Sequence, residues 1–228
     1  MTKEIYIKVT KNGPYLVYGA PKIHDQKIVV DAEGVSIIYE DGEIHAVESE
    51  PVALCRCGES KNAPFCDGSH IKVGFEGAET ASFEPILKNA VAIEGPNLTL
   101  MDNENYCSFA RFCDAHGRVW NLVQVGRPDT DKMAIADACN CPAGRLIILD
   151  EQGRPFEHKY EPSIGVLEDG GLKISGPLWV KGGIRVESES GKSYEVRNRQ
   201  TLCRCGKSGN KPFCNGAHAS IKFKAKRK

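Results

Sequence analysis

The 228-residue sequence has neither an excess of charge of one sign nor a long hydrophobic stretch. Thirty basic and thirty acidic residues give a formal net charge of zero, so no overall field favours binding to nucleic acid. A membrane span needs about 18 consecutive apolar residues, and an export signal needs an apolar run behind a basic start. Neither is present in the sequence. We therefore expect a soluble, cytoplasmic protein without a membrane span.

Motifs that carry enzymatic chemistry are also missing. The sequence has no glycine-rich phosphate loop, no nucleophile elbow and no paired-carboxylate motif. These absences favour a non-enzymatic protein over an enzyme with a substrate of its own.

Glycine, proline and cysteine are abundant. The 23 glycines and 12 prolines favour short elements joined by many turns, and a hydrophobic content of 41% is enough to form a core. Ten cysteines would suit disulfides in a secreted chain, but here they cluster beside histidines and no export signal precedes them. Metal ligation is therefore the better explanation of the cysteines.

Two segments carry three cysteines and one histidine at identical spacing. The candidate ligands are Cys55, Cys57, Cys66 and His70 in the first segment, and Cys203, Cys205, Cys214 and His218 in the second. Three thiolates with one imidazole suit a soft metal or an iron-sulfur cluster, whereas magnesium and calcium prefer oxygen ligands. Structural zinc is the main alternative, although a cysteine pair separated by one residue is less usual for zinc than a wider spacing.

The residue after the third cysteine is short and polar in both segments. Asp67 and Asn215 each precede Gly-x-His, where such a side chain can cap the amides of a helix that carries the histidine. We therefore expect a short helix at the end of each segment, which would orient the last ligand.

The first segment, from Cys55 to His70, resembles the CDGSH iron-sulfur family, the mitoNEET-like proteins, at every motif position. The second segment departs from the family pattern at Asn215 and Ala217. The resemblance implies one 2Fe-2S cluster in each segment. It places the first two cysteines of each set on one iron, and the third cysteine and the histidine on the other. It also implies a tandem protein, whose two sites pair within one chain or across a dimer.

Both segments follow stretches that we expect to form strands, and the first copy has an additional hairpin around Ile28 to Ile44. We expect an α+β, β-rich fold. Two CDGSH-type, β-rich metal-loop domains, at residues 1–84 and 161–228, would flank a small ferredoxin-like domain at residues 85–160.

Four further cysteines lie in the middle unit. Cys107 and Cys113 match the first and third positions of the C-x2-C-x2-C run of bacterial ferredoxins, and Cys141 precedes a proline, as the remote cysteine of that pattern does. A helix is expected just before Cys141. The unit resembles a divergent mono-cluster ferredoxin domain.

The ferredoxin resemblance implies Cys107, Cys113 and Cys141 as ligands of a 3Fe-4S or 4Fe-4S cluster. The fourth iron of a 4Fe-4S cluster would take Cys139, His116 or a non-protein ligand. Small core residues, a zinc site or a disulfide are the alternatives for these cysteines.

One-electron transfer between redox partner proteins is the function that these sites favour. A site with three thiolates and one imidazole carries less negative charge than one with four thiolates, which raises its reduction potential. Imidazole also titrates near neutral pH, so storage of clusters or delivery to apo-acceptor proteins is the second interpretation. A zinc-stabilised interaction module is the third. Because Arg204, Lys207 and Lys211 add positive charge, we expect the second site to have the higher potential.

Overall fold

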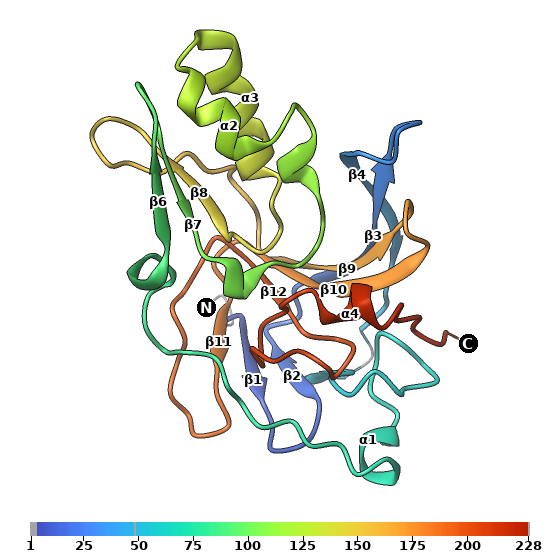
Figure 1. The fold of residues 1–228 in the computed structure, drawn as a ribbon. Helices are drawn as coiled ribbons and strands as arrows, with labels where there is room; N and C mark the ends of the chain where they lie inside the picture. Colours follow the sequence, from blue (N-terminus) through green and yellow to red (C-terminus); the bar gives the residue numbers. More distant parts are fainter. Residues whose placement is uncertain (1–3, 48, 228) are drawn as a thin grey trace.

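The computed structural model describes residues 4–47 and 49–227, and it is rich in β-structure, as the sequence predicts. Short strands form three sheets, and the helices α2 (Val119–Val125) and α3 (Pro128–Cys139) lie together at one end of the molecule (Figure 1). The short helix α1 (Ser69–Lys72) lies at the opposite end, and α4 (Ala217–Ser220) lies between these ends.

The first sheet has the order β11-β1-β2-β5, with β1 at Tyr6–Val9, β2 at Tyr15–Tyr18, β5 at Val52–Leu54 and β11 at Arg185–Glu187. Alternate side chains of β1 and β2 are buried, including Ile7, Val9 and Val17. This alternation is typical of strands that bury one face and leave the other partly exposed.

The second sheet has the order β12-β10-β9-β3-β4, with β3 at Lys22–Val30, β4 at Ser36–Ile44, β9 at Ser163–Asp169, β10 at Ile174–Lys181 and β12 at Arg199–Leu202. Every residue of β10 and β12 is buried. The hairpin expected between Ile28 and Ile44 is confirmed, because β3 and β4 pair in antiparallel fashion.

The two repeats exchange strands. β3, from the first repeat, pairs in parallel with β9 of the second, and β11, from the second repeat, pairs in parallel with β1 of the first. One hydrophobic core therefore contains residues of both repeats, such as Val17 and Val52 from the first, and Val166 and Leu202 from the second. Each repeat completes the sheet of the other.

The middle unit has its own sheet and its own core. Its sheet has the order β6-β7-β8, with β6 at Val91–Glu94, β7 at Thr99–Asp102 and β8 at Leu146–Leu149. Helices α2 and α3 contribute Val123 and Ala134 to a core that also contains Leu100 and Ile148. Three short 3-10 helices complete the unit, η1 (Ile86–Asn89), η2 (Glu104–Tyr106) and η3 (Phe112–Asp114).

The helix expected before Cys141 is confirmed as α3, which begins with Pro128 at its first position, where a proline is well tolerated. The domain boundaries after residues 84 and 160 stay predictions. Across the described ranges, no helix has the length and apolar character needed to cross a membrane.

Candidate metal centres

The first metal loop begins where β5 ends. Cys55 and Cys57 are buried, and their Sγ atoms lie 3.7 Å apart. Cys66 Sγ lies 3.4 Å from His70 Nδ1, with His70 on the short helix α1. The sequence-predicted ligands of this loop therefore form two close pairs, one of two thiols and one of a thiol and an imidazole.

The second metal loop follows β12 and repeats this geometry. The Sγ atoms of Cys203 and Cys205 lie 3.8 Å apart, and Cys214 Sγ lies 3.4 Å from His218 Nδ1. Within the described residues, no three His, Cys, Asp or Glu side chains are grouped as they would be around one metal ion. Two pairs of ligands fit a centre with two metal atoms, each holding one pair.

The contact between the two thiols of each Cys-x-Cys favours the thiolate form, which metal binding requires. A hydrogen bond from the Cys57 thiol lowers the pKa of Cys55 to about 6, and the same contact raises the pKa of Cys57. Cys205 likewise lowers the pKa of Cys203 to about 6. The contact therefore favours loss of the proton from one cysteine of each pair.

Backbone and hydroxyl hydrogen bonds hold both loops in one shape. In the first loop the Cys55 amide donates to the Pro64 carbonyl (2.8 Å), and the Ser60 hydroxyl donates to the Phe65 carbonyl (2.6 Å). The second loop has the same two bonds at the same lengths. The Cys203 amide donates to the Pro212 carbonyl, and the Ser208 hydroxyl donates to the Phe213 carbonyl. The loops are therefore preformed supports for their ligands.

Asp67 and Asn215 bind the loop backbone differently. Asp67 accepts hydrogen bonds from the amides of Lys61 (2.9 Å) and Ser69 (3.0 Å), and these bonds hold its pKa well below its usual range. Asn215 accepts one bond, from the amide of Ala217 at 3.2 Å. Each helix begins two residues after its polar residue, and the glycine between them takes the N-cap position. The polar side chain still accepts a hydrogen bond from the first helical amide.

A buried arginine inside each Cys-x-Cys anchors the loop to a distant part of its own repeat, the turn between β1 and β2 for Arg56 and strand β10 for Arg204. The count of charged residues in the sequence did not reveal this role. Arg56 Nε donates to the Gly13 carbonyl, and Arg204 Nε donates to the Gly176 carbonyl, each at 2.9 Å. Both side chains are 1% exposed. The position of the arginine between two ligands in both repeats is the signal that could have revealed it.

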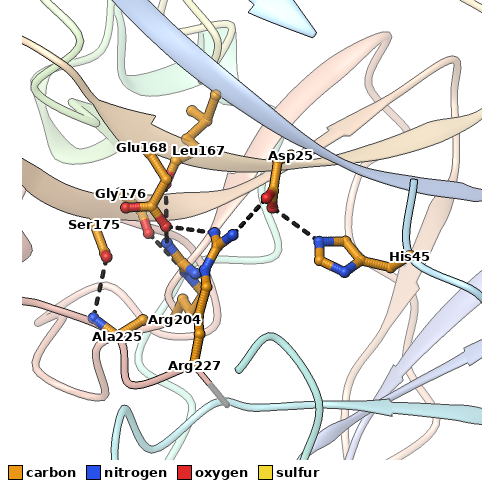
Figure 2. A network of polar contacts seen from close by, with 9 residues as sticks. All are labelled: Asp25, His45, Leu167, Glu168, Ser175, Gly176, Arg204, Ala225 and Arg227. Atoms are coloured by element: carbon orange, nitrogen blue, oxygen red, sulfur yellow. Dashed lines mark hydrogen bonds and ion pairs between the residues drawn. The ribbon is translucent and has the colours of Figure 1, made fainter. Parts of the chain in front are cut away.

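Arg204 also begins a charged network, which Figure 2 shows. Its Nη2 atom donates to Glu168 at 2.9 Å, Arg227 bridges Glu168 and Asp25, and Asp25 lies 2.8 Å from Nε2 of His45. The carboxylates near the second loop are therefore already paired with arginines.

The two loops pack against each other within one chain. A Cβ atom at Gly58 would lie 2.7 Å from the Cys205 carbonyl oxygen, and one at Gly206 would lie 2.5 Å from the Cys57 carbonyl oxygen. Both glycines also have positive φ angles, 83° and 75°. The reciprocal contact requires glycine at both positions, and it places the two metal centres side by side.

The second centre is more deeply buried than the first. His218 is 4% exposed and Cys214 is 3% exposed, whereas Cys66 and His70 are half-buried. Burial lowers the pKa of His218 to about 4. The middle unit covers this side, because a Cβ atom at Gly216 would lie 3.1 Å from the Cys107 carbonyl oxygen.

The middle unit has a cavity that is bordered by cysteines. Cys107, Cys113 and Cys141 line one cavity, which Arg145 also borders. Burial raises the pKa of Cys113 to about 12. All ten cysteines of the protein are free, so the disulfide alternative for the middle unit is not what the structure contains.

The two candidates for a fourth ligand lie elsewhere. The Cys139 thiol is buried and donates to the Phe156 carbonyl at 3.4 Å, and it does not line the cavity. His116 Nδ1 lies 2.6 Å from the Asp137 carboxylate. Three of the predicted ligands therefore line one cavity, whereas neither Cys139 nor His116 lines it.

A family model for the iron-binding zinc finger of CDGSH type matches residues 12–71 and again residues 175–219. No match was found among curated proteins or among solved structures. Each matched range contains one complete loop with its three cysteines and its histidine. The chain therefore contains two iron-binding domains of CDGSH type, one in each of the two ranges, and these domains support an iron-sulfur protein.

Proposed function

We propose that each CDGSH loop holds one 2Fe-2S cluster and that the protein passes single electrons between redox partner proteins. The observation that carries the proposal is the grouping of the ligands into pairs. Cys55 with Cys57 suits one iron, and Cys66 with His70 suits the other. A single zinc ion would instead need four ligands around one point.

The surroundings of the loops also suit electron transfer. Each loop is fixed by a buried arginine and by repeated backbone hydrogen bonds, so its ligands need little rearrangement when the charge of the centre changes. The direct contact between the loops, at Gly58 and Gly206, brings the two centres close enough to exchange electrons within one chain.

Storage or delivery of clusters is the second candidate, and one observation favours it at the first loop alone. Cys66 and His70 are only half-buried there, so an apo-acceptor protein could reach this pair. The buried pair of the second loop is better suited to permanent retention.

We further propose that Cys107, Cys113 and Cys141 bind a third cluster. Because Cys139 and His116 lie apart from the cavity, the protein offers three thiolates. Such a set suits a 3Fe-4S cluster, or a 4Fe-4S cluster with a non-protein fourth ligand. Since the Cys107 backbone contacts Gly216, the third centre would adjoin the second loop, and the three centres would form a row.

Single-site variants test the two CDGSH clusters. We expect Cys57→Ala and Cys205→Ala each to lower the iron and sulfide content by about two atoms per chain, because one 2Fe-2S cluster is lost. Cys139→Ala is the matched control, since it removes a buried cysteine outside the loops and should leave both contents unchanged. Paramagnetic resonance of the dithionite-reduced variants should show one remaining 2Fe-2S signal. A colourless, zinc-containing protein would refute the proposal.

The third cluster is tested in the same way. Iron analysis of the wild-type protein should give about seven or eight atoms per chain, against about four for two 2Fe-2S clusters alone. Cys141→Ala should lower the content by about three or four iron atoms, while His116→Ala should leave it unchanged. A wild-type content of about four iron atoms would exclude the third cluster and leave the first two intact.

A further inference from the structure

A hollow of about 450 Å³ lies beside the second metal loop, between β3, the turn that joins β9 to β10, and the C-terminal segment. Three lysines line it, Lys27 from β3, Lys173 from the turn and Lys224 from the C-terminal segment. All three are exposed. The hollow therefore has a cationic rim formed by three separate parts of the chain.

The positive charge of this rim is not offset locally. The two carboxylates in the lining are already paired, Glu168 with Arg204 and Arg227, and Asp169 with Arg111 at 2.6 Å. Figure 2 shows how both arginines converge on Glu168. Among the ion pairs of the described residues, none involves Lys27, Lys173 or Lys224. The three lysines are thus available to an anionic partner.

The floor of the hollow leads directly to the second metal loop. The Ser175 amide donates to the Phe223 carbonyl at 2.8 Å, and Phe223 packs in one apolar cluster with Cys203 and Cys205. The Phe223 amide donates to the His218 carbonyl at 2.9 Å. One aromatic residue therefore separates the hollow from the ligands of the second centre.

Two lysines of the C-terminal segment are not repeated after the first metal loop. The repeat aligns Phe75 with Phe223, so that Lys222 and Lys224 replace Gly74 and Glu76. Lys222 has a φ of 50°, and Gly74 has a φ of 59°. Lysine is strained in this left-handed conformation, which glycine adopts freely. The second loop thus carries a lysine where the backbone favours glycine.

We infer that this lysine hollow is the docking surface of an electron-transfer protein whose own redox centre is surrounded by acidic residues. The inference rests on the proposed electron transfer and assigns it to the second centre. Opposite charges on the two surfaces would speed and orient encounter. Leu172 and Ile221, next to Lys173 and Lys222 in the sequence, are exposed and supply the apolar contact area that protein interfaces need.

The test compares two variants with the same change in net charge. Lys27→Glu, Lys173→Glu and Lys224→Glu together reverse the charge of the hollow rim, whereas Lys132→Glu, Lys159→Glu and Lys192→Glu together reverse exposed lysines outside the hollow and both metal loops. A set of Lys27→Gln, Lys173→Gln and Lys224→Gln serves as the milder version if the first variant fails to fold. Stopped-flow absorbance would follow oxidation of a reduced, acidic 2Fe-2S ferredoxin by the holoprotein.

We expect the hollow variant to react at least about tenfold more slowly than the wild type at low ionic strength, and the control variant to react nearly as fast as the wild type. Added salt should slow the wild type but scarcely affect the hollow variant. An equal loss in both variants would show an effect of net charge alone and would overturn the inference. A larger loss in the control would place docking at the control lysines and would also overturn the inference.

Two further measurements separate this inference from its alternatives. If dithionite reduces the clusters but the wild type does not react with the ferredoxin, docking is refuted while the redox function stands. If dithionite produces no reduction, the proposed function itself fails. Binding of the wild type, but not of the hollow variant, to phosphatidylserine vesicles or to pyrophosphate, with unchanged electron transfer, would reassign the hollow to those anions.

Discussion

Arg199→Ala is expected to destabilise the protein by about 3–5 kcal/mol, because it removes a buried guanidinium and leaves buried carbonyl groups and the partly exposed Glu157 carboxylate without their donor. The Arg199 side chain is 1% exposed and binds both carboxylate oxygens of Glu157, at 2.8 and 2.9 Å. It also donates to the carbonyls of Ala138, Cys141 and Leu146. A residue of β12 thereby holds the middle unit against the strand that leads into the second metal loop.

Urea unfolding of the variant would measure this loss, with the middle unit expected to unfold first. Arg154→Ala is the matched control, because Arg154 is exposed and pairs with Asp150 on the surface, where such pairs contribute about 0–1 kcal/mol. Equal midpoints for the two variants would show that Arg199 does not join the middle unit to the second repeat.

Acid is expected to remove the cluster of the first loop roughly tenfold faster than that of the second, because the surroundings of a metal site control access of solvent to its ligands. His70 and Cys66 are half-buried, whereas His218 and Cys214 lie beneath the middle unit. Protonation of an imidazole ligand releases its metal, and burial holds the pKa of His218 down to about 4. The rate of loss should therefore rise first at the first loop as the pH falls.

Visible absorbance after a jump from pH 8 to pH 5 would measure both lifetimes. Cys205→Ala combined with Cys141→Ala isolates the first loop, and Cys57→Ala combined with Cys141→Ala isolates the second, so each decay can be assigned without fitting two phases. Equal lifetimes in the two variants would contradict shielding by the middle unit. A faster loss from the second loop would reverse the assignment of the labile site.

The metal loops could be predicted from sequence because their chemistry is local. The ligands from Cys55 to His70 lie within one short segment, and backbone hydrogen bonds inside that segment fix their geometry. The same holds for the hairpin of β3 and β4, whose two strands are neighbours in the chain. In both cases, residues that act together are close in sequence.

The remaining features depend on contacts between distant residues. Pairing of β1 with β11 and of β3 with β9 joins segments separated by most of the chain. Cys139 and Cys141 are separated by one residue in the sequence, yet only Cys141 lines the cavity. Cys139 is the last residue of α3, whereas Cys141 lies beyond the helix. The higher potential expected at the second loop stays a prediction, since Glu168 offsets the charge of Arg204.

The pairing of strands between the two repeats limits when the protein can fold during its synthesis. When the first repeat leaves the ribosome, β1 still lacks its neighbour β11, and β3 still lacks β9. Both partners lie beyond the middle unit, so the sheets around the first metal loop close only after nearly the whole chain has been synthesised. Because such long-range pairings form slowly, the nascent first half exposes unpaired strand edges in the meantime. Stable insertion of iron and sulfide is therefore expected after translation rather than during it.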